Sequence, residues 1–158
     1  MQHVLDFEEV LKNYIPYQES LTLIKNYKKE FSDNINSIKK EMESIINTSK
    51  TLVLDESTQV KNNLKLKSLQ AKGMEADADF RATIVELQNS ELEKNFKKII
   101  ELVDEYSKAN SIDIILNKSA VVYVNPKFEI TSIIIDILKE RSLYSIFNES
   151  DYILQDME

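Results

Sequence analysis

The sequence has very few residues that interrupt helices, with one glycine and two prolines among 158 residues. These are Gly73, Pro16 and Pro126, so long helices are the default for the stretches between them. Cysteine is absent, which excludes a disulfide framework and a thiolate metal site but leaves the redox compartment open. No run of about 18 apolar residues occurs, so no membrane-spanning helix is predicted.

Residues that commonly carry catalysis are scarce as well. His3 is the only histidine, and a single glycine excludes a phosphate-binding loop or a dinucleotide fingerprint. The carboxylates occur with lysines at helical spacing, which is typical of solvated helix faces. The sequence therefore predicts that the protein is not an enzyme, and no cofactor, metal ion or nucleic acid is expected.

Charge is distributed unevenly around a net charge of −7. Both ends of the chain are acidic, whereas residues 61–72 contain four lysines and no acidic residue. Isolated leucines and a methionine accompany these lysines, and this segment is the best candidate for an interaction surface. An ordinary solvated helix face is the other interpretation. The candidate residues are Lys61, Leu64, Lys65, Leu66, Lys67, Leu69, Lys72 and Met74.

Apolar residues at alternating steps of four and three predict two long helices that pack as a coiled coil. The first helix begins near residue 17, and the second ends near Asn110, which gives it a length of roughly 80 Å. The reversal is predicted between residues 47 and 55, where poor helix formers precede Asp55, a plausible N-cap. The predicted packing residues are Phe31, Ile35, Ile38, Met42, Val85, Leu92 and Ile99.

The two ends of the chain predict a small body that contains strands. Val4 and Leu5 end a short strand, Asp6 is a plausible N-cap for the helix that follows, and residues 112–116 and 120–124 predict a β-hairpin. Thr131 is a possible N-cap for a short helix over residues 132–141. Such a small sheet buries little apolar area, so self-association is expected. The candidate residues for it are Val4, Leu5, Ile112, Ile114, Leu116, Val122 and Val124.

The predicted fold is therefore mainly α with a small β body. A long antiparallel coiled-coil hairpin, over residues 17–109, is expected to project from that body. Residues 1–16 and 110–141 form the body, and residues 142–158 form an acidic C-terminal tail of unassigned structure.

Three segments resemble the Skp/OmpH family of periplasmic chaperones. Residues 112–123 (IDIILNKSAVVY) are similar to the family's pattern of a strand, a polar turn, and then Ala-Val and an aromatic residue. Residues 129–131 (EIT) match the Asp/Glu-Ile-Thr that follows in the family, and residues 4–11 (VLDFEEVL) are similar to its opening strand and helix. The resemblance extends over roughly residues 3–140 in element order.

This resemblance implies a homotrimer whose sheets join into a central β-barrel, with three helical arms around a cavity for unfolded outer-membrane proteins. It implies an ATP-independent holdase in the periplasm, with the signal peptide removed from the sequence given. The lysine-rich segment is then the candidate client-binding surface, with transient contact to a membrane surface as another use. Well-known members of the family are basic, whereas this chain carries −7, and its tail extends beyond their usual end.

A second function belongs to a different class, namely a cytosolic prefoldin-like or scaffolding coiled coil that binds one specific partner. Prefoldin subunits share the helical hairpin but place their strands between the two helices. Here both chain ends supply strands, which favours the chaperone.

Overall fold

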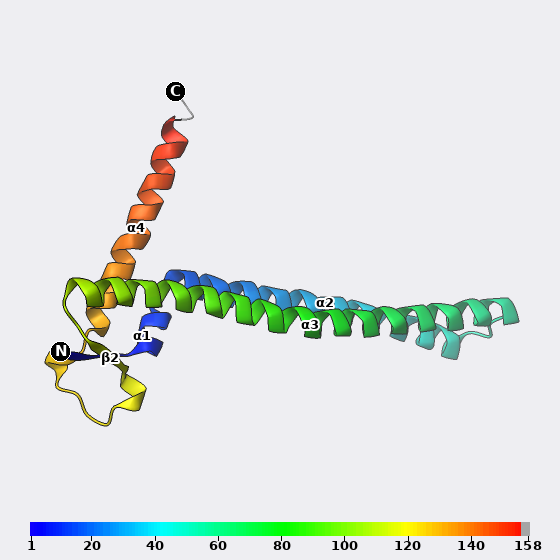
Figure 1. Cartoon of the computed structure of the whole chain (residues 1–158). Helices are drawn as coiled ribbons and strands as arrows, with labels where there is room; N and C mark the ends of the chain where they lie inside the picture. Colours follow the sequence, from blue (N-terminus) through cyan, green and yellow to red (C-terminus); the bar gives the residue numbers. More distant parts are fainter. Residues whose placement is uncertain (156–158) are drawn as a thin grey trace. The chain divides into compact units, whose positions relative to one another are not determined.

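The computed structural model describes the backbone of residues 1–155 and the side-chain surroundings of residues 1–143. The chain is mostly helical, as expected, and also has a small sheet (Figure 1). In chain order the elements are β1 (Gln2–Leu5), α1 (Phe7–Lys12), α2 (Ile15–Thr51), α3 (Glu56–Ala109), β2 (Ile114–Asn117), two 3₁₀ turns (Lys118–Ala120 and Pro126–Phe128) and α4 (Thr131–Gln155).

The chain forms two compact units. The first, which we call the body unit, comprises residues 1–20 and 91–158, and the second, the arm unit, comprises residues 21–90. The body unit therefore includes the beginning of α2 and the last part of α3, both of which the sequence analysis assigned to the arm.

Local capping chemistry sets the beginnings of the first and third helices. The Asp6 carboxylate accepts a hydrogen bond from the Glu9 backbone N–H at 3.1 Å, and the Asp55 carboxylate accepts one from the Thr58 N–H at 2.9 Å. Each bond satisfies an N–H group that the first helical turn leaves without a partner. Both predicted N-caps are confirmed, and the reversal between α2 and α3 falls within the predicted interval.

Both ends of the chain meet in the sheet of the body unit. Strand β1 pairs with β2 in parallel, with Gln2 opposite Ile114 and Leu5 opposite Asn117. The Val4 carbonyl also accepts a hydrogen bond from the Ile130 N–H at 3.0 Å. This sheet has two strands among the described residues, and they come from segments more than 100 residues apart in the chain.

The predicted β-hairpin is wrong for the single chain. Residues 118–120 form a 3₁₀ turn, and residues 121–125 belong to no strand. Val121 has extended backbone angles, so the segment has strand-like geometry at this point but no neighbouring strand. Strand propensity is expressed only when cross-strand and same-face neighbours exist. The valines supply the propensity, and the single chain does not supply the neighbours.

A compact apolar core holds the body unit together. Ile99 from α3 and Ile134 from α4 are fully buried, and Val10 of α1 lies beside them without exposure. The core therefore ties α1, α3 and α4 to β1. Its buried members are Leu5, Val10, Leu11, Tyr14, Ile99, Leu102, Ile130, Ile134 and Leu138.

In the arm unit, α2 and α3 run along each other (Figure 1). Phe80 stacks on Phe31 with 4.0 Å between ring centroids and on Tyr27 with 5.7 Å. The face of α2 predicted to pack is half-buried at Phe31, Ile35, Ile38 and Met42.

The packed face of α3 differs from the prediction. Among the predicted packing residues of α3, Val85 and Leu92 are 56% and 37% exposed and Ile99 is buried, and Ile84, which was not predicted, is buried as well. A straight α-helix drifts by about 20° for each seven-residue repeat, so residues seven apart do not stay on one face over several repeats. Val85 and Leu92 are therefore surface residues in the structure, and Ile99 is part of the body core.

Helix α4 is longer than expected, because it continues through Gln155 rather than ending near residue 141. The sequence has no glycine or proline after Pro126 to end it. Thr131 does begin this helix, but its hydroxyl accepts a hydrogen bond from the Asp6 N–H at 2.9 Å. The predicted acidic tail comprises residues 142–158, and its side chains from residue 144 onward lie outside the described part of the structure.

Candidate functional site

The candidate sites among the described residues are surfaces. Among residues 1–143, no three histidine, cysteine, aspartate or glutamate side chains lie close enough together to hold a metal ion. No helix in the described part of the chain is long and apolar enough to cross a membrane. The candidates are therefore apolar grooves and exposed apolar or basic side chains.

The predicted lysine and leucine segment divides into two faces of α3. Leu69 is buried and Leu66 is half-buried, so these two side chains belong to the packing within the arm unit. Leu64 and Met74 are 63% and 69% exposed. Lys61, Lys67 and Lys72 are exposed, and the Lys65 ammonium lies 3.3 Å from the Glu41 carboxylate. The outward face thus combines cations with exposed apolar side chains.

A shallow groove lies on the arm unit beside this face. It has a volume of about 380 Å³, and Lys72, Glu75 and Asp79 of α3 line it with Glu41 of α2. Its lining carries more acidic than basic side chains, and Ile38 and Leu69 form its apolar floor. The groove suits a mixed polar surface contact better than an apolar anchor.

The reversal between α2 and α3 exposes apolar side chains that the sequence analysis did not propose as a site. Leu52 is 58% exposed, and Val53 is fully exposed. Turns ordinarily carry glycine, proline, asparagine, aspartate or serine. The run Leu52-Val53-Leu54 between two helix ends was the available signal, because an apolar turn is unusual.

An apolar groove lies on the body unit, beside the sheet. It has a volume of about 540 Å³ and runs between β1 and the segment that follows β2. Val4, Val121, Tyr123, Val124 and Phe128 are among the residues that line it. The Lys118 ammonium donates to the Glu129 carboxylate at 2.9 Å, which raises the pKa of Lys118.

Three of the candidate residues for self-association, Val4, Leu116 and Val124, line this groove, and the other four lie outside its lining. Val4 and Leu5 are buried in the single chain, and Ile112 and Val124 are half-buried. Ile114 and Leu116 are 46% and 43% exposed, and Val122 is fully exposed. Tyr123, which was not a candidate, is 79% exposed.

A second apolar surface of the body unit was also missed. Phe7 of α1 stacks on Phe96 of α3 with 4.7 Å between ring centroids. The two rings line a groove of about 460 Å³ together with Leu11, Tyr17 and Leu92. Phe96 and Val103 are seven residues apart, and this spacing was the available signal for an apolar surface. The same spacing also occurs in ordinary helix packing, and no sequence pattern distinguished the two.

The family of the chain follows from a comparison with protein-family models. The model described as outer membrane protein (OmpH-like) matches residues 3–138. The chain belongs to the OmpH-like family. This confirms the family that the strand and helix segments near both ends of the chain indicated.

The fold of this OmpH-like chain is also found in a solved structure. The crystal structure of an OmpH-like protein from Caulobacter crescentus CB15 matches with a TM-score of 0.59 and 16% sequence identity. The match covers 89% of this chain and 84% of the other. A comparison with curated proteins gave no match.

Proposed function

We propose that this protein is an ATP-independent holdase chaperone that binds unfolded outer-membrane proteins between helical arms and prevents their aggregation. The observation that carries the proposal is the OmpH-like family match over residues 3–138. The related Caulobacter protein is named an outer membrane chaperone. The exposed apolar and basic side chains of the arm unit support weak, multivalent binding, in which many contacts act together and each one breaks easily.

We also propose that three copies associate through the body unit. Support comes from the apolar groove beside the sheet and from the exposure of Val122 and Tyr123 next to it. An extended valine-rich segment without a neighbouring strand is suited to pairing with another copy. Light scattering should give a mass near three times 18.4 kDa.

Assembly can be tested with two substitutions in one segment. Val122→Asp places a charge on the exposed apolar side chain, so it should lower the measured mass. Ser119→Asp places the same charge at an exposed position of the 3₁₀ turn that precedes this segment and is the matched control. A monomeric or dimeric wild-type protein would refute the trimer, and equal masses for both variants would refute the role of Val122.

Holdase activity is tested by diluting a urea-unfolded outer-membrane β-barrel protein into buffer with and without this chain. We expect suppressed light scattering without nucleotide. Lys61→Glu with Lys67→Glu should weaken the effect more than Lys25→Glu with Lys28→Glu, which reverses the same charges on exposed positions of α2. Failure of the wild-type protein to suppress aggregation would favour a scaffold that binds one defined partner.

The reversal of the arm supports a proposal of transient contact with an anionic membrane surface. Leu52 and Val53 present apolar side chains there, and Lys50 and Lys61 flank the segment that also contains Asp55 and Glu56. Cosedimentation with anionic vesicles should exceed that with neutral vesicles, and Val53→Asp should reduce it. Equal binding to both vesicle types would contradict the proposal. The proposed location is the periplasm, which cell fractionation would test.

A further inference from the structure

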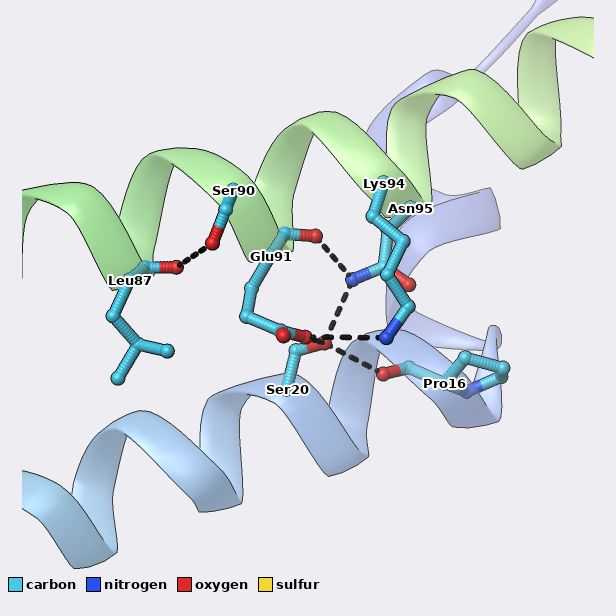
Figure 2. Close-up of polar contacts among 7 residues, drawn as sticks. All are labelled: Pro16, Ser20, Leu87, Ser90, Glu91, Lys94 and Asn95. Atoms are coloured by element: carbon cyan, nitrogen blue, oxygen red, sulfur yellow. Dashed lines mark hydrogen bonds and ion pairs between the residues drawn. The ribbon is translucent and has the colours of Figure 1, made fainter.

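Three polar side chains replace the apolar contacts between α2 and α3 at one level of the body unit (Figure 2). They are Ser20 of α2 and Glu91 and Asn95 of α3, and we call them the polar layer. Asn95 is 1% exposed and Ser20 is 5% exposed. The side chain of Glu91 is 17% exposed. Buried polar groups at a helix-packing position are unusual, because their desolvation must be offset by hydrogen bonds.

The polar layer is internally satisfied. The Asn95 amide nitrogen donates to the Ser20 hydroxyl oxygen at 2.9 Å and to the Glu91 carbonyl at 2.8 Å. The Ser20 hydroxyl in turn lies 2.6 Å from the Glu91 carboxylate and 3.0 Å from the Pro16 carbonyl, and it donates its single proton to one of these two acceptors. The Lys94 ammonium lies 3.6 Å from the same carboxylate. Every side chain of the layer therefore has a partner across or along the helix pair.

The polar layer coincides with the limits of the body unit. That unit contains α2 only as far as Ser20, and its part of α3 begins with Glu91. On the body side, Tyr14 and Ile99 belong to the apolar core, which α1 and α4 also hold. Within the arm unit, by contrast, the buried apolar side chains among the described residues are Ile24, Leu69 and Ile84.

We propose that the polar layer is a cooperativity boundary, at which the arm unit opens locally while the body unit stays folded. When the helix pair separates, the Asn95–Ser20 and Ser20–Glu91 hydrogen bonds, which join the two helices, are exchanged for bonds to water. Such an exchange has a small net cost. An apolar layer would instead connect the packing of the arm unit to the body core, and the two would then open together.

The test is hydrogen exchange on the full chain without any client, so its result is independent of the proposed chaperone activity. In the wild-type protein, amides of residues 24–48 and 56–87 should exchange through openings with a smaller denaturant dependence than amides of residues 99–106. If the arm amides and the body amides showed the same denaturant dependence of exchange, both units would open together, and the proposal would be overturned.

A triple variant tests whether the polar layer itself sets this boundary. Ser20→Ala, Glu91→Leu and Asn95→Leu should raise the protection of the arm amides by about tenfold and bring their denaturant dependence toward that of the body amides. Ser90→Ala is the matched control, because the exposed Ser90 hydroxyl donates only to the Leu87 carbonyl of its own helix among the contacts drawn in Figure 2.

Two further variants keep the test decisive if the triple variant does not fold. Glu91→Gln retains an acceptor for the Ser20 hydroxyl and should exchange like the wild-type protein. Asn95→Leu alone should shift arm protection in the same direction as the triple variant, by less. If Asn95→Leu left the protection of the arm amides unchanged, the polar layer would not be the boundary. Weak packing within the arm unit would then be sufficient to explain why the arm unit opens separately.

Discussion

Neighbouring residues Ile84 and Val85 allow the packed face of α3 to be tested directly. Ile84 is 9% exposed and Val85 is 56% exposed. Ile84→Ala removes three carbons from a buried side chain, which costs about 2.4 kcal/mol at about 0.8 kcal/mol each. Alanine has a better helix propensity than isoleucine, which offsets about 0.5 kcal/mol of this loss. The expected net loss of local stability is therefore about 2 kcal/mol.

Val85→Ala, which removes two carbons from an exposed side chain, should change stability by less than about 0.5 kcal/mol, as is usual for exposed sites. Hydrogen exchange of arm-unit amides measures both variants. A loss of about 2 kcal/mol corresponds to amide exchange that is about 30-fold faster. The exchange rates of arm-unit amides in Ile84→Ala and Val85→Ala should therefore differ by about that factor. Equal losses would refute the structural assignment and would restore the face identified by the seven-residue repeat.

Three other changes have expected outcomes. A Cβ at Gly73 would meet no heavy atom within 4 Å, so Gly73→Ala should stabilise the arm unit by about 1 kcal/mol in hydrogen exchange, and a loss would contradict this. Thr131→Val removes the acceptor of the Asp6 N–H and should cost about 1–3 kcal/mol in urea unfolding, whereas an unchanged midpoint would show that the bond contributes nothing. Hydrogen bonds from the Thr58 side chain and N–H lower the pKa of Asp55. Its cap should therefore persist at neutral pH and be lost as the pH falls below about 4, and a Thr58 amide NMR signal that does not titrate there would contradict this.

Local chemistry made the helix ends predictable from the sequence. Asp6 and Asp55 are short polar side chains before helical stretches, and each one caps its helix through bonds to residues only three positions away. Scarcity of glycine and proline likewise predicted the long helices. Thr131 shows the limit of this reasoning, because its hydroxyl accepts from a residue 125 positions earlier in the chain.

The packed face of α3 was less predictable, because its buried apolar residues do not follow a single repeat. The seven-residue repeat of Val85, Leu92 and Ile99 includes two exposed side chains and one buried side chain, and the buried Ile84 lies outside it. Periodicity identifies apolar stripes but does not identify which stripe has a neighbour. Asn95 adds to the ambiguity, since a polar residue at a packed position looks like surface until Ser20 is placed beside it.

The segment 120–124 was predicted as a strand from its β propensity. The prediction does not hold for one chain, because the segment has no neighbouring strand there. Its valines and Tyr123 suit a pleated, half-buried surface, yet Val122 is fully exposed and Tyr123 is 79% exposed. If another copy of the chain supplied the neighbouring strand, the sequence would show strand propensity at this segment, although one chain alone would form no strand there. This supports the proposed assembly and explains the choice of Val122→Asp as its test. If that variant kept the wild-type mass, the strand signal would need a different partner.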